Sequence, residues 1–251
     1  MAALVMLAVG FGAVSHDSAQ AHSGHLQKNL LAARWSGNWP STGLKQIYMG
    51  YSYGPGCSSG VAWCSDWVVA GDAALASWDA TPSIFQTTKV SAGSANENLR
   101  FVIVGSGNCA SVWGKNLCMS TSGVFGEAFF LNSSGNTCSA TSSSCIYTRA
   151  VVLLRASVEG ISSGCGSDSD CWYTKQGNSA HEMGHVFSLG HEPTLSSGGD
   201  LVCGDTSHYV TVMDVDCIAQ QQANGPRNWD SCGLQHAYYD PFRGYPNCGM
   251  N

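Results

Sequence analysis

The sequence predicts an α+β fold, in which a sheet with two helices precedes a long region of little regular structure. Two segments with helical spacing and several strand-like apolar runs lie between residues 44 and 189. Past His191 these patterns fade, and Gly, Asp, Asn and Cys dominate. The 251 residues suffice for one domain with a sizeable core, and no internal repeat divides them. We therefore expect one compact domain, from residue 44 to residue 251.

The first half of this domain is predicted to contain a strand, a helix and a second strand. Leu44–Tyr51 alternates between polar and apolar residues, as a half-buried strand does. Asp66–Asp79 carries Val, Ala, Leu and Trp at spacings that favour a helix packed on a sheet. Phe101–Val104 is a short apolar run that Gly105 ends, which indicates a buried strand.

Two more strands and a second helix complete the regular part. Glu127–Leu131, after Gly126, is predicted as a strand. Ala150–Leu154, with the sequence AVVLL, is the strongest strand signal in the chain. Ser162–Asp170 is polar and predicted as a loop, and a helix follows from about Tyr173 to Leu189.

The start of the second helix has two competing interpretations. Ser179 and Glu182 match the spacing of a capping box, which would begin the helix late and give Glu182 a backbone role. Thr174 is an alternative N-cap that leaves the Glu182 carboxylate free.

The residues before this domain are interpreted as a secretory leader and a lead-in. Met1–Val14 is apolar but too short to span a bilayer, and Ala19-Gln20-Ala21 resembles a cleavage site. Residues 1–21 are therefore predicted to be a signal peptide, with a buried N-terminal helix as the alternative. Residues 22–43 are polar, and we expect a flexible lead-in or short pro-segment. The expected product is secreted and extracellular, without a membrane anchor.

Charge and composition narrow the classes of partner. The net charge is −6 and no basic run occurs, which argues against nucleic acid or anionic membranes as partners. Charged residues are sparse while Gly, Ser and Thr are plentiful, a composition typical of loop-rich extracellular proteins. We expect a monomer.

Twelve cysteines, all after the proposed cleavage point, indicate a disulfide framework. Counting does not determine their connectivity, although their clustering favours pairing between nearest neighbours. This interpretation includes Cys165–Cys171 and Cys203–Cys217. A cysteine-rich zinc site is the alternative, but the chain contains no CxxC motif.

The motif that carries the chemistry is His181-Glu182-Met183-Gly184-His185, followed by His191. His181 and His185 lie four residues apart, so both imidazoles leave one face of a helix. His191 can complete a tripod if the chain turns sharply after the helix. Three neutral nitrogen ligands leave a fourth position of a tetrahedral zinc ion open to water. Glu182, beside the first ligand, can accept a proton from that water.

These residues, together with Met213 in Val212-Met213-Asp214, resemble the metzincin metallopeptidases. The resemblance implies that His181, His185 and His191 bind one catalytic Zn²⁺, that Glu182 is the general base, and that Met213 forms a floor beneath the ligands. The order of the upstream elements is most similar to matrixin-type catalytic domains. A glutamate directly after the third histidine, here Glu192, is also a feature of astacins, but the residues after it do not continue the astacin pattern. The sequence TVMDVDC around Met213 fits no subfamily well.

The resemblance also implies an architecture and a substrate. The metzincin fold has an upper subdomain, with a twisted mixed sheet and two helices, and an irregular lower subdomain, which here would be rich in disulfides. The active-site cleft lies between the two. An extended protein or peptide substrate would add a strand to the sheet edge, which by resemblance is Gly126–Leu131; an ordinary interior strand is the alternative. The expected function is that of a zinc endopeptidase.

One residue departs from the family pattern. The family usually has glycine three residues after the second histidine, where this chain has Ser188, with Gly190 two residues later. Either Ser188 adopts the strained turn or Gly190 takes its place. Ser188 is also the support for the alternative function, a catalytically inactive metzincin-like binding module with structural zinc. A different zinc hydrolase, such as a deacetylase, is a third hypothesis, which His191 disfavours.

Several other polar residues are weaker candidates for roles near the site. Asp214 and Asp216 could orient the turn around Met213, or face water as loop acids. Tyr209, Tyr238 and Tyr239 are candidates for stabilising a reaction intermediate, although they could equally line the specificity pocket or pack. Asp168 and Asp170 are weak candidates for a Ca²⁺ site, because two carboxylates supply few of the oxygens that calcium requires.

Overall fold

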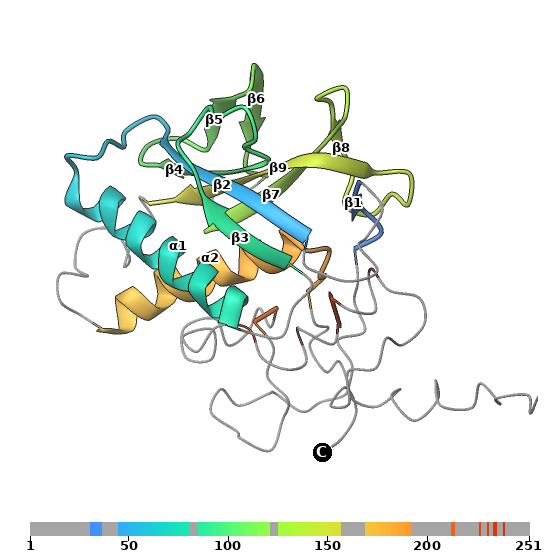
Figure 1. Ribbon diagram of the computed structural model, residues 1–251. Coiled ribbons are helices and arrows are strands. Elements are labelled where there is room, and N and C mark those ends of the chain that lie inside the picture. The colour runs from blue at the N-terminus through green and yellow to red at the C-terminus, as the bar shows by residue number, and fades with distance from the viewer. Residues whose placement is uncertain are drawn as a thin grey trace, which may run out of the picture.

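The structure is a computed structural model (Figure 1). It describes residues 31–36, 45–80, 85–120, 125–156 and 169–191, together with residues 212, 213, 226, 230, 233, 234 and 238. Of residues 169–174 it describes the backbone only. The predicted signal peptide, residues 1–21, lies outside the described residues. No helix in the described part of the chain is both long and apolar enough to cross a membrane.

A mixed sheet of seven strands forms the centre of the described fold, in the order β3-β2-β4-β9-β7-β8, with β1 also paired to β9. Strands β1, β2, β3, β4 and β9 pair in parallel, and β7 runs antiparallel to β9 and β8. The bounds of these strands are β1 Arg34–Trp35, β2 Lys45–Tyr53, β3 Phe85–Lys89, β4 Leu99–Val104, β7 Gly126–Asn132, β8 Thr137–Cys138 and β9 Ile146–Arg155.

Two helices cover one face of the sheet, and a hairpin covers the other (Figure 1). The helices are α1, Ala62–Ala80, and α2, Ser169–Val186; the hairpin consists of β5, Cys109–Val112, and β6, Lys115–Cys118. All six residues of β4 are buried, as are the last six of β9. Burial on both faces explains why these strands are continuous apolar runs rather than alternating ones.

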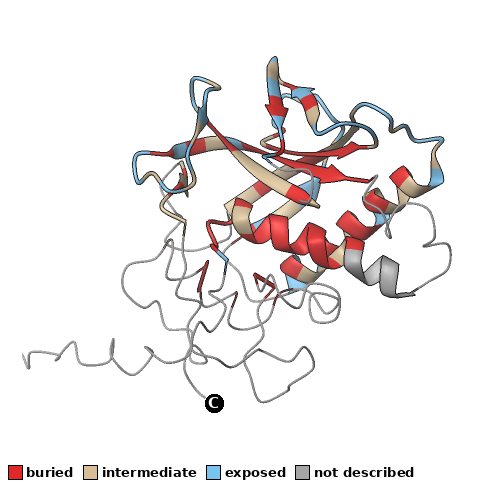
Figure 2. Ribbon diagram, turned by 180° about the vertical axis from the view of Figure 1, so that it is seen from behind, coloured by how far each residue is buried: buried red, intermediate tan, exposed pale blue. Residues whose placement is uncertain are grey.

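Helix α2 is buried almost throughout its described side chains (Figure 2). Ala180, Met183 and Val186 point into the main core at helical spacing. The Trp78 indole N–H of α1 donates a hydrogen bond to the Ala180 carbonyl, 3.0 Å away. The Trp35 indole N–H and the Tyr147 hydroxyl both donate to the Val186 carbonyl at 2.7 Å. The helix is therefore held at both its middle and its end, by residues from three other elements.

The predicted elements are confirmed, with two corrections at their ends. The structure contains the two expected helices and each expected strand, so the α+β class with a mixed sheet is confirmed. The second helix begins at Ser169, so the prediction of loop for Ser169 and Asp170 was wrong. Because Ser179 lies inside this helix, neither the capping box with Glu182 nor a cap at Thr174 exists.

The segment expected as a flexible lead-in contributes a strand where it is described. Trp35 of β1 is buried and its ring packs against Tyr147, with 4.7 Å between centroids. The backbone N–H of Leu31 donates to the Ser188 carbonyl at 2.9 Å. Residues 31–36 thus belong to the folded unit, because an aromatic side chain there fills the core beside the end of α2.

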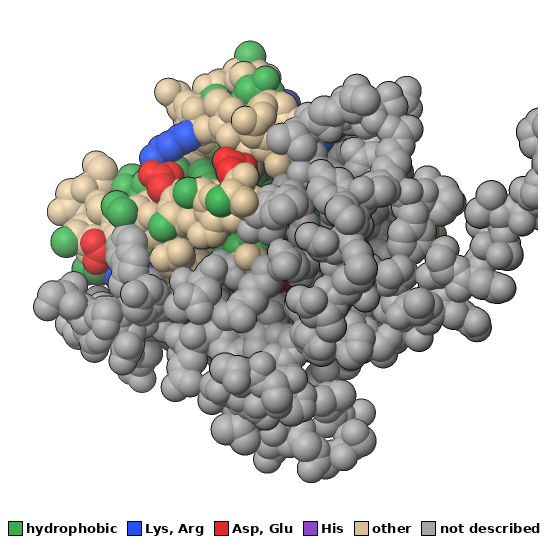
Figure 3. Space-filling model, turned by 60° about the horizontal axis from the view of Figure 1, so that its bottom comes forward, with side chains coloured by type: hydrophobic (Ala, Val, Ile, Leu, Met, Phe, Trp, Pro, Cys, Tyr) green, Lys and Arg blue, Asp and Glu red, His purple; other side chains and the backbone are tan. Residues whose placement is uncertain are grey.

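Three of the expected nearest-neighbour disulfides are present: Cys57–Cys64, Cys109–Cys118 and Cys138–Cys145. Cys109–Cys118 joins paired positions of the β5–β6 hairpin. The predicted pairs Cys165–Cys171 and Cys203–Cys217 lie outside the residues whose side chains are described. On the face shown in Figure 3, the described surface carries few charged side chains, of both signs. Lys89 and Asp72 form an exposed ion pair of 2.6 Å.

Candidate metal centre and cleft

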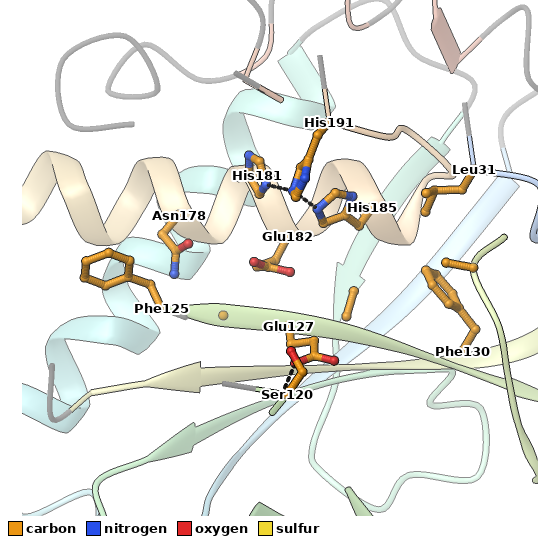
Figure 4. A pocket seen from close by; sticks show the side chains of 13 residues that line it. Leu31, Ser120, Phe125, Glu127, Phe130, Asn178, His181, Glu182, His185 and His191 are labelled. Atoms are coloured by element: carbon orange, nitrogen blue, oxygen red, sulfur yellow. Dashed lines mark hydrogen bonds between the residues drawn. The ribbon is translucent and has the colours of Figure 1, made fainter. Parts of the chain in front are cut away.

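The structure brings His181, His185 and His191 together at one end of a cavity (Figure 4). His181 and His185 are one helical turn apart on α2, and His191 approaches from the segment after the helix. The distance from His191 Nε2 is 3.1 Å to His181 Nε2 and 3.0 Å to His185 Nε2. Nitrogen ligands about 2.0–2.1 Å from a tetrahedral zinc ion lie roughly 3.3 Å apart. Both distances from His191 Nε2 are close to that value.

Backbone carbonyls determine which ring nitrogens carry protons. His181 Nδ1 lies 2.8 Å from the Val212 carbonyl and His185 Nδ1 lies 2.8 Å from the Leu189 carbonyl. A carbonyl only accepts, so both Nδ1 atoms donate. When these rings are neutral, their Nε2 atoms therefore present lone pairs toward the centre of the cluster.

Burial also favours the neutral form of these rings. It lowers the pKa of His181 well below its ordinary value, and the neighbouring His185 and His191 lower it further. The pKa of His185 is lowered to about 4 by burial and by His191. Burial lowers the pKa of His191 as well. Neutral imidazole is the form that binds metals, so the cluster is ready to act as a ligand set near neutral pH.

Ser188 ends the helix and directs the chain back toward His191. Its φ of 70° lies in the left-handed region. The Ser188 N–H donates to the His185 carbonyl at 2.8 Å, and the Leu189 N–H donates to the Gly184 carbonyl at 2.9 Å. These two bonds form a Schellman motif, in which glycine is the usual left-handed residue. Of the two sequence alternatives, Ser188 rather than Gly190 takes the turn.

The Ser188 side chain offsets this strain with hydrogen bonds that glycine could not make. Its Oγ donates to the Ala33 carbonyl at 2.8 Å and lies 3.0 Å from the Tyr147 hydroxyl. The Tyr238 hydroxyl is a third partner. Of the tyrosines proposed to stabilise an intermediate, Tyr238 instead packs here, and burial raises its pKa. Tyr209, Tyr239, Asp214, Asp216 and Asp168 lie outside the described residues, as does the side chain of Asp170.

Met213 is fully buried against the turn of α2 that carries the histidines. The carbonyl of Val212, the preceding residue, is the one that accepts from His181 Nδ1. The Val212 N–H donates to the carboxylate of Asp230, whose two oxygens are each 3.2 Å away. Asp230 is itself fully buried. Asp230, Val212 and His181 thus form a chain of hydrogen bonds that fixes the orientation of the imidazole.

Glu182 points into the same cavity, between the histidines and strand β7 (Figure 4). Its side chain is buried, and its Oε2 has no hydrogen-bond partner among the described residues. Burial raises the pKa of Glu182 to about 8, and the negative charge of Glu127 adds to the effect. Gly126 of β7 packs directly on this carboxylate: a Cβ there would lie 2.9 Å from Glu182 Oε1.

The cavity has a volume of about 540 Å³ and runs along β7. Phe125 and Asn178 line one end, and Leu31 and Phe130 line the other (Figure 4). Strand β8 pairs only with Phe130 and Leu131 of β7. In the described part of the chain, the outer side of residues 126–129 has no strand partner. Residues 126–129 of β7 therefore form a sheet edge beside the histidines, whereas residues 130 and 131 lie between two paired strands.

The chain matches no protein-family model, and no curated protein is significantly similar to it. The interpretation of the site therefore depends on its geometry. Sequence reasoning identified the three histidines, Glu182 and Met213, but missed Asp230 and Asn178 as parts of the site. Asp230 is one of many acidic residues in the tail, and no spacing separates it from the others. Gly126 was expected in the substrate-binding edge Gly126–Leu131, but its packing on the Glu182 carboxylate was not.

Proposed function

We propose that this protein is a secreted zinc endopeptidase of the metzincin type. The observation that carries the proposal is the convergence of three imidazole Nε2 atoms beside a buried carboxylate, on the edge of a sheet. The Nδ1–H bonds of His181 and His185 leave both Nε2 lone pairs directed into the cluster. A single N–H of His191 cannot fully satisfy both, whereas a cation can bind all three rings. The nitrogen donor set and its spacing fit Zn²⁺.

His181, His185 and His191 would hold the ion, with Met213 packed beneath them. When bound, zinc would supply a Lewis acid that polarises a carbonyl group and makes a nearby water molecule more acidic. The Nδ1–H bonds to the Val212 and Leu189 carbonyls keep the rings of His181 and His185 oriented, so little reorganisation would be needed on binding.

Glu182 would accept the proton of the attacking water and pass it to the amine that leaves. Its carboxylate has an unpartnered oxygen and lies beside the histidines, so a water between them would be within reach. A divalent cation there would lower the pKa of Glu182 from about 8 and favour the ionised form that a base requires. Exclusion of solvent from this carboxylate strengthens its interactions in the cleft.

An extended peptide would bind along residues 126–129 of β7. Backbone groups on the outer side of a sheet edge are available to an added strand, which is a common mode of peptide recognition. A peptide on this edge passes Glu182 and the three histidines (Figure 4). The cavity is large enough for several side chains, and both apolar and polar residues line it.

The alternative, an inactive binding module with structural zinc, has less support. Its basis in the sequence was Ser188, and Ser188 completes the helix end with a full set of hydrogen bonds. A structural site has no use for an unpartnered carboxylate beside its metal. Three local disulfides are in keeping with the proposed extracellular location, since disulfides persist in oxidising compartments.

The proposal is tested by digestion of an unfolded, carboxymethylated protein with the purified chain. We expect cleavage that a zinc chelator stops and added zinc restores. Glu182→Gln should reduce hydrolysis by at least a thousandfold while zinc content stays near one ion per chain. The matched variant Glu127→Gln removes a neighbouring carboxylate, and its rate of hydrolysis should stay within about tenfold of that of the wild type. Chelator-insensitive cleavage, or full activity in Glu182→Gln, would contradict the proposal.

A further inference from the structure

Asn178 presents an unsatisfied amide to the cavity one helical turn before Glu182. Its side chain is 3% exposed and lines the cavity beside Phe125 (Figure 4). Its Nδ2 has no hydrogen-bond partner among the described residues. A buried amide without a partner is costly, and asparagine is also a poor residue for the interior of a helix. Leucine would avoid both costs at this position, so a ligand is the natural source of the missing partner.

The alternation of side chains along a strand determines which side chains of a bound peptide would meet Asn178. Side chains of a strand added to the β7 edge would alternate between the two faces of the sheet. Gly126 and Phe130 face the α2 side, where Gly126 packs on Glu182. A substrate side chain on that same face would enter the space between β7 and α2. When the peptide backbone passes Glu182, a side chain next to the cleaved bond reaches the end of the cavity formed by Asn178 and Phe125.

We propose that Asn178 selects substrates with an asparagine or glutamine at one fixed position next to the cleaved bond. This inference rests on the proposed peptidase function and adds its substrate class. An amide of the substrate offers an acceptor to Nδ2 and a donor to Oδ1 of Asn178. The methylene groups of the substrate side chain pack on the Phe125 ring.

Other substrate side chains fit this end of the cavity less well. An aliphatic side chain leaves Nδ2 unpaired, and sites built for hydrogen bonds reject such analogues strongly. A carboxylate there would lie near the Glu182 carboxylate, which lines the same cavity. Lysine and arginine carry only donors, so neither can accept from Nδ2.

The test compares wild type with Asn178→Leu on a library of peptides from a digested proteome, read by mass spectrometry. The wild type should show a preference for Asn and Gln at one position of roughly tenfold to a hundredfold in kcat/KM over Leu. Asn178→Leu should lose this preference and favour Leu or Met at that position, with unchanged zinc content. Asn178→Ala, a smaller replacement, should lose the preference as well, which guards against misfolding of the leucine variant.

A measurement of stability provides a readout independent of catalysis. Replacement of an unsatisfied buried amide by leucine should raise the melting temperature by about 2–4 °C. Ser179→Ala is the matched control: Ser179 is adjacent, fully buried and also unpartnered among the described residues, but it does not line the cavity. It should leave the cleavage preference unchanged.

The outcomes that would overturn the role of Asn178 differ from the outcome that would overturn the peptidase function. An identical cleavage profile in wild type and both Asn178 variants would overturn this inference while leaving the peptidase function intact. A fall in melting temperature in both variants would assign the amide an internal partner and also overturn it. Absence of chelator-sensitive cleavage by the wild type would remove the proposed function and this inference together.

Discussion

Gly184 and Met213 are in direct contact beneath the histidine cluster. A Cβ built at Gly184 would overlap the Met213 sulfur and lie 3.3 Å from its terminal methyl carbon. Gly184 separates Met183 from His185 on α2, so the glycine is what allows the buried methionine to approach the turn that carries the imidazoles. The proposed floor of the metal centre therefore depends on a residue with no side chain.

Replacement of Gly184 by alanine should destabilise the protein even though alanine is the better helix former. The propensity gain of about 1 kcal/mol is expected to be outweighed by overpacking, which costs about 1–3 kcal/mol in a filled core. We expect a lower free energy of unfolding in urea and weaker zinc binding. Gly184→Ala combined with Met213→Ala should recover part of the loss, and strict additivity of the two changes would contradict the contact.

Ser188 offers a second prediction, which separates backbone strain from hydrogen bonding. Ser188→Gly relieves the left-handed strain, about 1 kcal/mol, but loses the bonds of Oγ to Ala33 and the two tyrosines. Ser188→Ala keeps the strain and loses the same bonds. Stability should therefore fall in the order wild type, Ser188→Gly, Ser188→Ala, as measured by chemical denaturation. A glycine variant more stable than the wild type would mean that these bonds contribute less than the strain costs, which would contradict the proposed offset.

Asp230 provides a third prediction because its carboxylate is connected to the metal centre through Val212. An asparagine at position 230 would have one acceptor oxygen in place of two and would turn an N–H group toward the buried backbone of Val212. The Val212 carbonyl would then hold the His181 ring less firmly in its orientation. We expect Asp230→Asn to weaken zinc affinity about 10- to 100-fold, measured by competition with a chromophoric chelator. Asp79→Asn is the control, since Asp79 is exposed and, in the described part of the chain, its carboxylate accepts hydrogen bonds from Thr87 of the edge strand β3. Equal effects from both variants would argue against an oriented network.

The regular elements and the histidine cluster could be predicted because their signals are local. The buried strands are apolar runs, and two histidines four apart on a helix share a face whatever surrounds them. Strand β3, Phe85–Lys89, was missed because its residues are mostly polar and it pairs only with β2 at the edge of the sheet. The hairpin β5–β6 was missed because its turn uses Trp113 and Gly114 with positive φ, and Trp is an unusual residue there.

The remaining parts of the site depend on contacts between distant segments. Asp230 reaches Val212 across 18 residues, and Gly126 meets Glu182 only because β7 pairs with β9 in one register. The helix start at Ser169 was missed for a different and local reason, since the first residues of the helix show no apolar periodicity. Such pairings follow from the assembled sheet, which no short window of sequence contains.

Gly126 gives the last prediction, which concerns the position of the Glu182 carboxylate. A Cβ there would lie 2.7 Å from Glu182 Cγ and 2.9 Å from Oε1, so Gly126→Ala must displace the side chain. Because small misplacements of a catalytic group reduce rates strongly, we expect kcat to fall about 10- to 100-fold with zinc content unchanged.

The double variant Gly126→Ala with Glu182→Gln separates this effect from general damage to the sheet. If the alanine acts only by moving the carboxylate, the double variant should be no less active than Glu182→Gln alone. Gly60→Ala is the control for a glycine replacement, because the nearest atom to a Cβ there is 3.9 Å away. A further loss of activity in the double variant would show that Gly126 supports the strand rather than the base.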